Sequence, residues 1–317
     1  MINYVDAHSD TFFKIIYENA GSFEKQNPEL QITLPGLKKA GTLLQTFAIF
    51  AEDKNNIDYM KSAFLNISSF TLESINKNSK HIKFVESVNE VFLNRADNII
   101  SAIMSVEGAG FIEHPSHVAL LKKIGVKMLS LTWNYENNLA FGQKVNQTSG
   151  LKKLGHDVVL ECRKNNIVVD VSHINYKGFF DIAELMENTP FIASHSNAYR
   201  ICATPRNLKD EQLKAIKESK GVIGINLYPE IVSNKKNVNI DDVIEHIDYI
   251  ADRIGIDYIG LGTDFDGIEK TPEGLENVTK IQSLFERLAE RGYKNDDIVK
   301  IASSNFLRVF NQVWENL

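Results

Sequence analysis

The chain has 317 residues, 43% hydrophobic, 24% charged and 9% aromatic, which excludes collagen-like, low-complexity and largely disordered proteins. Its 35 basic and 41 acidic residues give a net charge of -6, so no dominant basic field is present to bind nucleic acid or an anionic membrane. The two cysteines, Cys162 and Cys202, are too few for a disulfide framework and favour a reducing compartment.

Neither a targeting segment nor a membrane span is expected. The residues after Met1, INYVDAHSD, lack the basic and apolar regions of a signal peptide. No apolar run approaches the roughly 18 residues that cross a membrane. We therefore expect a cytoplasmic protein that contacts no membrane.

Short apolar, β-branched runs recur along the whole chain and predict eight strands. In chain order they occupy residues 3–7, 42–50, 99–106, 127–132, 167–172, 190–195, 221–227 and 258–263. Most of them lack polar alternation, which is typical of strands buried on both faces.

Amphipathic helical patterns separate these strands. They include residues 58–75, 117–124, 151–165, 211–217 and 241–254. Ser87 with Glu90 forms a capping-box pattern that predicts the start of another helix. Eight strands alternating with helices are typical of an α/β fold of the (β/α)₈ TIM-barrel type. An open doubly wound sheet is the alternative, but no G-x-G-x-x-G follows an early strand.

The domain organisation follows from this pattern. No Pro/Gly/Ser-rich linker and no abrupt change of composition divides the chain. We expect a single barrel domain over residues 1–317, with additional C-terminal helices over about 276–317.

Polar residues gather where the predicted strands end. In a barrel, the carboxyl ends of the strands and the loops after them carry the catalytic residues. The residues at these positions are His8, Asp10, Glu107, His173, His195 and Asp264. A lone histidine or aspartate at such a position is more often a core or capping residue, but this number of them at one end of a barrel predicts a metal site. Asp6 and Asp266 are instead expected to anchor loops or turns.

Imidazole and carboxylate ligands suit Zn²⁺, with Mn²⁺ or Co²⁺ as substitutes. Three histidines and two carboxylates exceed the three protein ligands usual for one catalytic zinc, so we expect two Zn²⁺ per chain. Two dications about 3.5 Å apart repel by roughly 19 kcal/mol at an effective dielectric constant of about 20, so an anion has to lie between them. Glu107 is the natural bridge.

The motifs that carry these residues resemble the renal (membrane) dipeptidase family of binuclear zinc peptidases, including its bacterial members. The resemblance spans essentially the whole chain, through VDAHSD, SVEGAG, LSLTWN, VVDVSHIN, ASHSNAYRICATPRNL, GINLY, IGLGTDFDG and SSNFLRVF. The amidohydrolase superfamily more widely begins its barrel with H-x-H, whereas this chain has His8-x-Asp10.

The resemblance implies a role for each matching position. His8, Asp10 and Glu107 would bind one zinc, and Glu107, His173 and His195 would bind the other. Asp264 matches the family's acid/base aspartate. Arg206 matches the arginine that binds the carboxylate of the dipeptide, and Tyr228 matches a position that lines the substrate pocket.

The sequence departs from the family pattern after the fourth predicted strand. Many members have a histidine there, in LTH, whereas this chain reads Leu131-Thr132-Trp133-Asn134. Trp133 therefore occupies the place of a residue that contacts substrate and helps to stabilise the tetrahedral intermediate. Asn134, or the metal itself, is the candidate for that role here.

The predicted function is hydrolysis of free dipeptides by metal-activated hydroxide. The resemblance also implies broad specificity, often with a D-residue at the second position, and a homodimer. Two alternatives stay open: a binuclear metal hydrolase of lactones, cyclic amides or phosphoesters, and, least favoured, a non-catalytic binding barrel.

Overall fold

The computed structural model describes residues 1–52 and 56–315. Its strands form one parallel sheet in the order β6-β5-β4-β2-β1-β8-β7. The short strand β3 pairs with the beginning of β4, and β5 pairs with the later part of β4. The strands are β1 (Tyr4–Asp6), β2 (Thr42–Phe50), β3 (Ile82–Phe84), β4 (Ile100–Glu107), β5 (Val126–Ser130), β6 (Val168–Asp170), β7 (Ile223–Ile225) and β8 (Ile259–Leu261). This curled parallel sheet with surrounding helices is the expected barrel type of α/β fold.

The segment 190–195 connects β6 to β7 and differs from the expectation. It was predicted as a strand, but it makes only two single bridges, from Ile192 to Asp170 and from Ala193 to Ile223. The reason is that two of its backbone N–H groups bond to side chains: Ser194 N donates to Asp170 Oδ1 at 2.8 Å and His195 N to Ser172 Oγ at 3.2 Å. The ladder is therefore interrupted next to the predicted site.

Gly262, which directly follows β8, explains how the segment 190–195 comes so close to the neighbouring strand. A Cβ atom at position 262 would lie 1.7 Å from the carbonyl oxygen of Ser194. Only glycine admits this approach.

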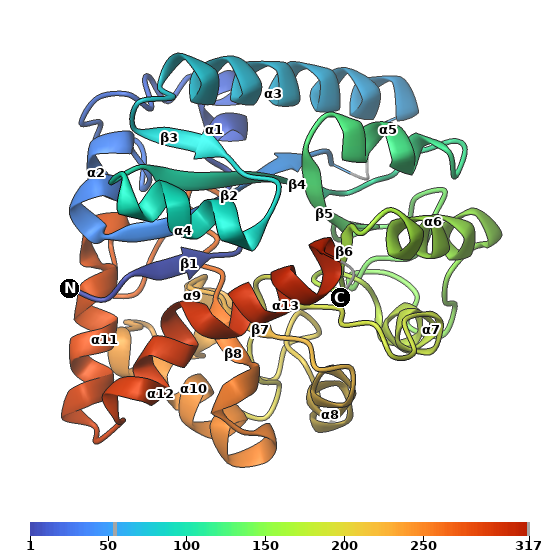
Figure 1. Ribbon diagram of the computed structural model, residues 1–317. Helices are drawn as coiled ribbons and strands as arrows, with labels where there is room; N and C mark the ends of the chain where they lie inside the picture. Colours follow the sequence, from blue (N-terminus) through green and yellow to red (C-terminus); the bar gives the residue numbers. More distant parts are fainter. Residues whose placement is uncertain (53–55, 316–317) are drawn as a thin grey trace.

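Helices follow most strands and form the outer layer of the ring (Figure 1). They are α1 (Thr11–Tyr17), α2 (Leu34–Ala40), α3 (Ile57–Lys77), α4 (Val88–Ala96), α5 (His117–Lys123), α6 (Lys153–Lys164), α7 (Tyr176–Leu185), α8 (Asp210–Glu218), α9 (Pro229–Val232), α10 (Ile240–Ile254), α11 (Ile281–Glu290), α12 (Asn295–Val299) and α13 (Asn305–Trp314). Short turns of other helix types are η1 (Ile256–Tyr258), η2 (Val278–Lys280) and the π-helical η3 (Lys300–Ser304). The predicted helix start at Ser87 is confirmed, since Ser87 Oγ accepts the N–H of Glu90 at 3.2 Å. The Glu90 carboxylate accepts from the N–H of Glu86, one residue earlier than a capping box requires.

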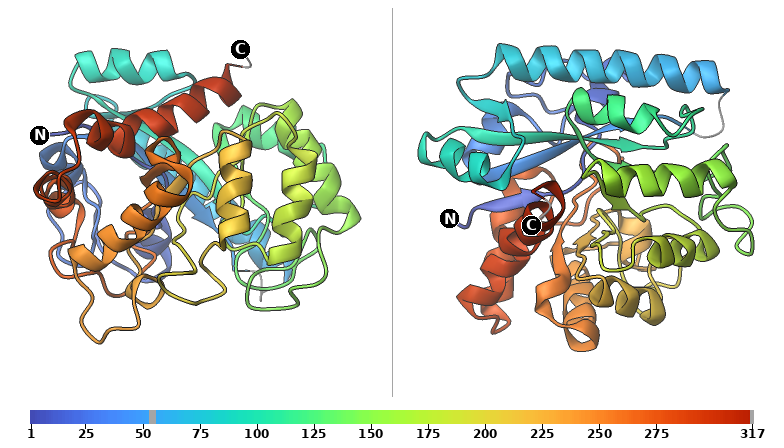
Figure 2. Two further views of the ribbon diagram at one scale, coloured as in Figure 1. Left: turned by 90° about the horizontal axis from the view of Figure 1, so that it is seen from below. Right: turned by 45° about the vertical axis from the view of Figure 1, so that its right-hand side comes forward.

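The predicted C-terminal helices close one end of the barrel, and only residues 316 and 317 of the expected range lie outside the described residues. Phe306, Phe310 and Trp314 of α13 share an apolar cluster with residues from the strands, among them Met128 and Val168. Figure 1 shows α13 crossing the middle of the ring. Seen from the side, α13 and α4 lie at one end of the barrel and long loops at the other (Figure 2, left). The strands' carboxyl ends are thus left open for a site.

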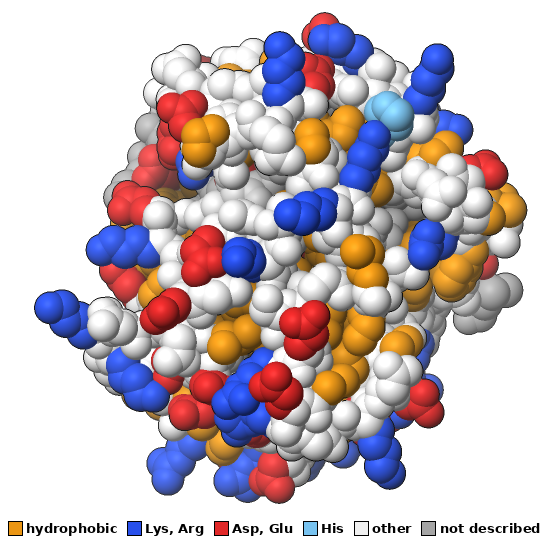
Figure 3. All heavy atoms as spheres, turned by 90° about the vertical axis from the view of Figure 1, so that its left-hand side faces the viewer, with side chains coloured by type: hydrophobic (Ala, Val, Ile, Leu, Met, Phe, Trp, Pro, Cys, Tyr) orange, Lys and Arg blue, Asp and Glu red, His pale blue; other side chains and the backbone are white. Residues whose placement is uncertain are grey.

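The distribution of charged side chains on the surface is consistent with the low net charge of -6. On the face shown in Figure 3, acidic and basic side chains are interspersed, so this face has no field of one sign. Within the described part of the chain, none of the helices has the length and apolar character needed to cross a membrane.

Candidate metal centre

The predicted metal ligands converge at the carboxyl ends of the strands. His8 follows β1, Glu107 is the last residue of β4 and His173 follows β6. His195 ends the interrupted segment 190–195, and Asp10 is the N-cap residue of α1. His8, Asp10, Glu107 and His195 are at most 5% exposed, and the His173 side chain is 10% exposed.

Glu107 lies between two groups of ligand atoms. Its Oε2 is 3.3 Å from His8 Nε2, which lies 3.3 Å from Asp10 Oδ2. Its Oε1 is 3.0 Å from His173 Nε2 and 3.6 Å from His195 Nε2. Each group has three residues that could hold a metal ion, and the two groups have Glu107 in common; a third combination joins His8 of one group and His195 of the other to Asp264. One carboxylate oxygen faces each group, which is the geometry of a bridging ligand.

The donor atoms fit a metal ion. His173 Nε2 and His195 Nε2 lie 2.9 Å apart, and their distances to Glu107 Oε1 are 3.0 and 3.6 Å. Ligands placed 2.0–2.1 Å from a tetrahedral zinc lie about 3.3 Å from one another. In the other group, His8 Nε2 and Asp10 Oδ1 are buried and have no hydrogen-bond partner among the described residues. Buried polar atoms without partners indicate a missing ligand.

The electrostatics of the cluster also favour a cation. Burial acts to raise the pKa of Glu107, but His8 and His173 hold it well below its ordinary value. Burial acts to lower the pKa of His8, but Glu107 and Asp10 hold it well above its ordinary value. Burial, followed by the charge of Arg206, lowers the pKa of His173 to about 4. The site therefore stabilises positive charge beside the carboxylates and keeps His173 as a neutral imidazole.

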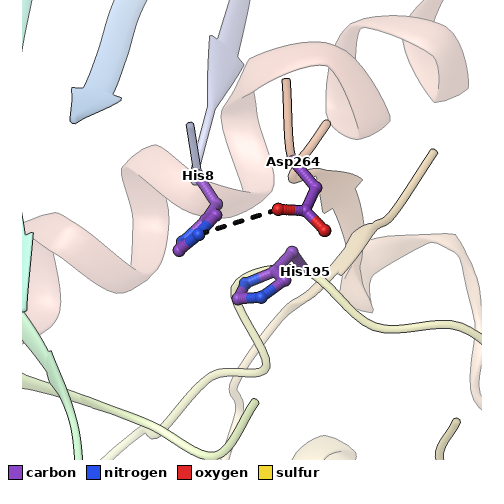
Figure 4. Close-up of side chains that lie close together, drawn as sticks. All are labelled: His8, His195 and Asp264. Atoms are coloured by element: carbon purple, nitrogen blue, oxygen red, sulfur yellow. Dashed lines mark ion pairs between the residues drawn. The ribbon is translucent and has the colours of Figure 1, made fainter. Parts of the chain in front are cut away.

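Asp264 lies at the edge of the same cluster. Its Oδ1 is 3.9 Å from His8 Nε2, and Figure 4 shows its carboxylate above the His195 ring and beside His8. Asn226 Nδ2 donates to its other oxygen at 2.9 Å. Burial raises the pKa of Asp264 to about 7; His8 lowers it, whereas Asp10 and Glu107 raise it. A carboxyl group with a pKa near neutrality is suited to proton transfer.

Three residues of this region have left-handed backbone conformations, with φ of +66° at His173, +63° at Asp264 and +67° at Asp266. Such conformations cost non-glycine residues about 1–3 kcal/mol each and cluster at functional sites. Gly267, next in the chain, has a steric role, since a Cβ there would lie 2.2 Å from Asp10 Oδ2.

Asp6 and Asp266 act as anchors, as expected. Asp6 accepts from the backbone and hydroxyl of Thr263 at 2.9 and 2.7 Å, so it holds the end of β8 beside β1. Asp266 accepts from Gln31 N at 2.7 Å and Thr11 Oγ1 at 2.7 Å. Neither residue belongs to a potential metal-binding group within the described part of the chain.

A cavity of about 910 Å³ opens above the cluster, and the four predicted substrate-binding residues line it. Arg206 is only 9% exposed, and it donates to Ser196 Oγ at 2.8 Å and to the carbonyl of His195 at 2.6 Å. No carboxylate of the described residues lies within ion-pair distance of it, and Asp210, the first acidic residue after it in the sequence, pairs with Arg253. Tyr228 is the N-cap residue of α9.

Trp133 and Asn134 also line the cavity and differ in what they contact. The Trp133 ring makes an edge contact with Phe50, with a centroid separation of 5.2 Å. Asn134 Oδ1 accepts from Gln143 Nε2 at 2.7 Å and lies 2.9 Å from His173 Nδ1. Because an amide oxygen only accepts, His173 Nδ1 is the donor and its Nε2 is free to bind a metal. Asn134 thus orients His173.

Asn226 and Gln143 contribute to the site but were not predicted from the sequence. Asn226, which contacts Asp264, lies directly after β7, so the rule that singled out the other strand ends would also have found it. Gln143 lies in a long loop before α6, and no local pattern marks it.

A parallel β/α barrel with histidine and carboxylate groups converging at the strands' carboxyl ends defines a metal-dependent enzyme. Residues 1–316 match the model of the membrane dipeptidase family, peptidase family M19. The chain belongs to this family and is a metallo-dipeptidase of the M19 type.

Individual relatives agree with this assignment. The chain is 30% identical over 300 residues to dipeptidase aclJ of Aspergillus oryzae, which covers 89% of this chain and 70% of the relative. A solved metallo peptidase from Rhodobacter sphaeroides, liganded with a phosphinate mimic of the dipeptide L-Ala-D-Ala, is 25% identical with a TM-score of 0.91 over 99% of both chains. The solved metallo peptidase dipeptidase AC is 27% identical, also with a TM-score of 0.91 over 99% of both chains.

Proposed function

We propose that the chain hydrolyses the peptide bond of free dipeptides with two Zn²⁺ ions. His8, Asp10 and Glu107 would hold one ion, and Glu107, His173 and His195 the other. The observation that carries this proposal is the position of Glu107, whose two oxygens face two separate ligand groups. Zinc bound there would polarise the scissile carbonyl and lower the pKa of a water molecule.

Arg206 supports the choice of a free dipeptide. A buried guanidinium without a carboxylate partner among the described residues is costly, and a substrate carboxylate would supply the missing anion. The bonds to Ser196 Oγ and to the His195 carbonyl fix the plane of the guanidinium. Its other N–H groups make no hydrogen bond within the described part of the chain, so they can form a charge-assisted contact with substrate.

Asp264 would move the proton. Its carboxylate lies beside His8 and is oriented by Asn226, and its pKa of about 7 allows it to accept a proton from water and pass it to the leaving amine. Tyr228 and Trp133 would bound the space for the substrate side chains.

The finer features belong to the same proposal. Acceptance of a D-residue at the second position is supported by the L-Ala-D-Ala mimic bound to the Rhodobacter sphaeroides relative. A cytoplasmic location is supported by the unpaired state of both cysteines. A homodimer and zinc as the native metal complete the proposal.

The decisive experiment compares dipeptides with their C-terminal amides. Arg206→Ala is expected to lower kcat/KM for L-L and L-D dipeptides by about 10²-fold and for the amides by less than about fivefold, since only the dipeptides carry the carboxylate. Lys270→Ala, at another cation lining the cavity, is the matched control and should change both by less than about threefold.

Metal content is measured on the same samples. Chelation should abolish activity, and restoration should need two Zn²⁺ per chain. Equal losses on dipeptides and amides would contradict the carboxylate contact, and activity only on lactones or phosphoesters would favour another hydrolase.

A further inference from the structure

A chain of hydrogen bonds lies behind His195, on the side away from Glu107. Asp170 Oδ2 is 2.5 Å from Ser194 Oγ, and Ser194 Oγ is 2.7 Å from His195 Nδ1. Asp170 is 5% exposed and the other two residues are fully buried. A carboxylate, a hydroxyl and an imidazole are thus connected in series out of contact with bulk water.

The direction of each bond follows from the number of protons available. Asp170 Oδ1 accepts the backbone N–H groups of Ser172 at 2.9 Å and Ser194 at 2.8 Å, and the carboxylate has no proton to donate. The single hydroxyl proton of Ser194 therefore goes to Asp170 Oδ2. At 2.7 Å, one of Ser194 Oγ and His195 Nδ1 must still donate, so Nδ1 of His195 carries the proton.

We propose that Asp170, acting through Ser194, is a positioning residue that fixes His195 as the tautomer with a proton on Nδ1. This tautomer leaves the Nε2 lone pair facing His173 Nε2 at 2.9 Å and Glu107 Oε1 at 3.6 Å, as a metal ligand requires. The inference rests on the proposed metal site.

The two imidazoles of this ligand group are held by different partners. His173 Nδ1 donates to the neutral amide of Asn134, whereas His195 Nδ1 donates to a hydroxyl that is bound to a carboxylate. This difference makes an isosteric change at Asp170 informative. In Asp170→Asn, the two backbone N–H groups still need an oxygen at the Oδ1 position, so the amide NH₂ replaces Oδ2.

The NH₂ group then donates to Ser194 Oγ, and the hydroxyl proton of Ser194 turns to His195 Nδ1. The other acceptor near the Ser194 hydroxyl, Ser172 Oγ, is farther away at 3.3 Å. His195 is then driven to the tautomer with a proton on Nε2, which cannot bind a metal there. Ser194→Ala only removes the preference, because Nδ1 loses its partner without gaining a donor.

The test measures Zn²⁺ affinity by competition with a chromophoric chelator and, in the metal-free protein, the protonated nitrogen of His195 by ¹⁵N NMR. Asp170→Asn is expected to weaken binding of the Zn²⁺ ion held by Glu107, His173 and His195 by about 100-fold, and to move the proton of His195 to Nε2. Ser194→Ala is expected to weaken binding of the same ion by about 10-fold. Ser303→Ala, which removes a buried hydroxyl of η3 that contacts only the carbonyl of Val299 among the described residues, is the control and should stay within about threefold.

A merely structural role would make the isosteric Asp170→Asn milder than Ser194→Ala, and that order would overturn the proposal. A proton on Nε2 in the metal-free wild-type protein would also overturn it, and this measurement needs no folded variant. Failure of the wild-type protein to bind Zn²⁺ would instead contradict the proposed function, while the tautomer would remain measurable.

Discussion

The two ends of the barrel are built on opposite physical principles. At the end where the strands begin, Phe306, Phe310 and Trp314 of α13 are buried in an apolar cluster, and the Phe310 and Trp314 rings stack with centroids 4.4 Å apart. At the end where the strands finish, buried carboxylates and imidazoles form groups of three whose ligand atoms lie within 4.8 Å of one another.

The difference separates stability from activity. Apolar burial is non-directional and stabilises the fold in proportion to the area removed from water. Buried charges and left-handed residues cost free energy unless a partner compensates them, so they persist where function needs them. Substitutions at the first end should act on unfolding, and substitutions at the second end on metal binding and catalysis.

The largest effect is expected from Glu107→Gln. The amide cannot present a charged oxygen to both ligand groups, so Zn²⁺ content should fall below two per chain and kcat/KM by about 10³-fold or more. Activity and metal analysis on the same preparation check this. Glu90→Gln on α4 is the control with the same chemical change, and it should leave both quantities unaltered. Full activity in Glu107→Gln would contradict the expectation that substitutions at the carboxyl end of the barrel act on metal binding and catalysis.

At the opposite end, Phe310→Ala is expected to cost about 3–5 kcal/mol of unfolding free energy, because a fully buried ring is lost from the cluster under the barrel. Thermal unfolding should show a fall in Tm of several degrees, while kcat/KM of the folded protein at room temperature stays within about twofold. Phe92→Ala on α4, at a ring that is 55% exposed, should cost less than about 0.5 kcal/mol. A loss of activity at unchanged Tm would contradict the comparison.

A smaller, pH-dependent effect is expected at His246 of α10, which connects the loop after His195 to the end of α9. Its Nδ1 accepts from Ala198 N at 3.1 Å and its Nε2 donates to the carbonyl of Val232 at 2.8 Å, so the neutral ring satisfies both partners. Burial lowers its pKa from 6.5 to about 4. Because the unfolded chain takes up the proton first, stability is unaffected above pH 6.5 and decreases by up to roughly 3 kcal/mol as the pH falls from 6.5 to 4.

His246→Gln can keep both hydrogen bonds without titrating. Urea unfolding of the two metal-free proteins, measured from pH 7.5 to 4, should therefore show a steeper loss for the wild type. Parallel curves would show that His246 does not titrate in this range.

Much of the site could be predicted from residues at strand ends. His8, Glu107, His173 and His195 each follow or end a buried apolar run, and the carboxyl ends of parallel strands meet at one edge. Asn226 satisfies the same rule. Asp170 also ends a strand, β6, but the role that it shares with Ser194 could not be recognised in this way, because that role depends on two segments meeting side by side.

The strand at 190–195 shows the same limit within the fold. Its apolar run is that of a strand, yet side chains of Asp170 and Ser172 replace main-chain partners and interrupt its ladder. Local composition carries no information about such a replacement, since the partners are more than 20 residues apart.

The sequence by itself determined most of the strands, the barrel type of fold and the residues able to bind a metal, because hydrophobic periodicity and residue chemistry are local properties; it did not indicate the short strand β3. Only the tertiary structure decided that Glu107 faces both ligand groups, that Arg206 has no carboxylate partner among the described residues and that Asp170 reaches His195 through Ser194. These features depend on distances of about 3 Å between groups from different segments of the chain, which only the closed packing of the barrel sets.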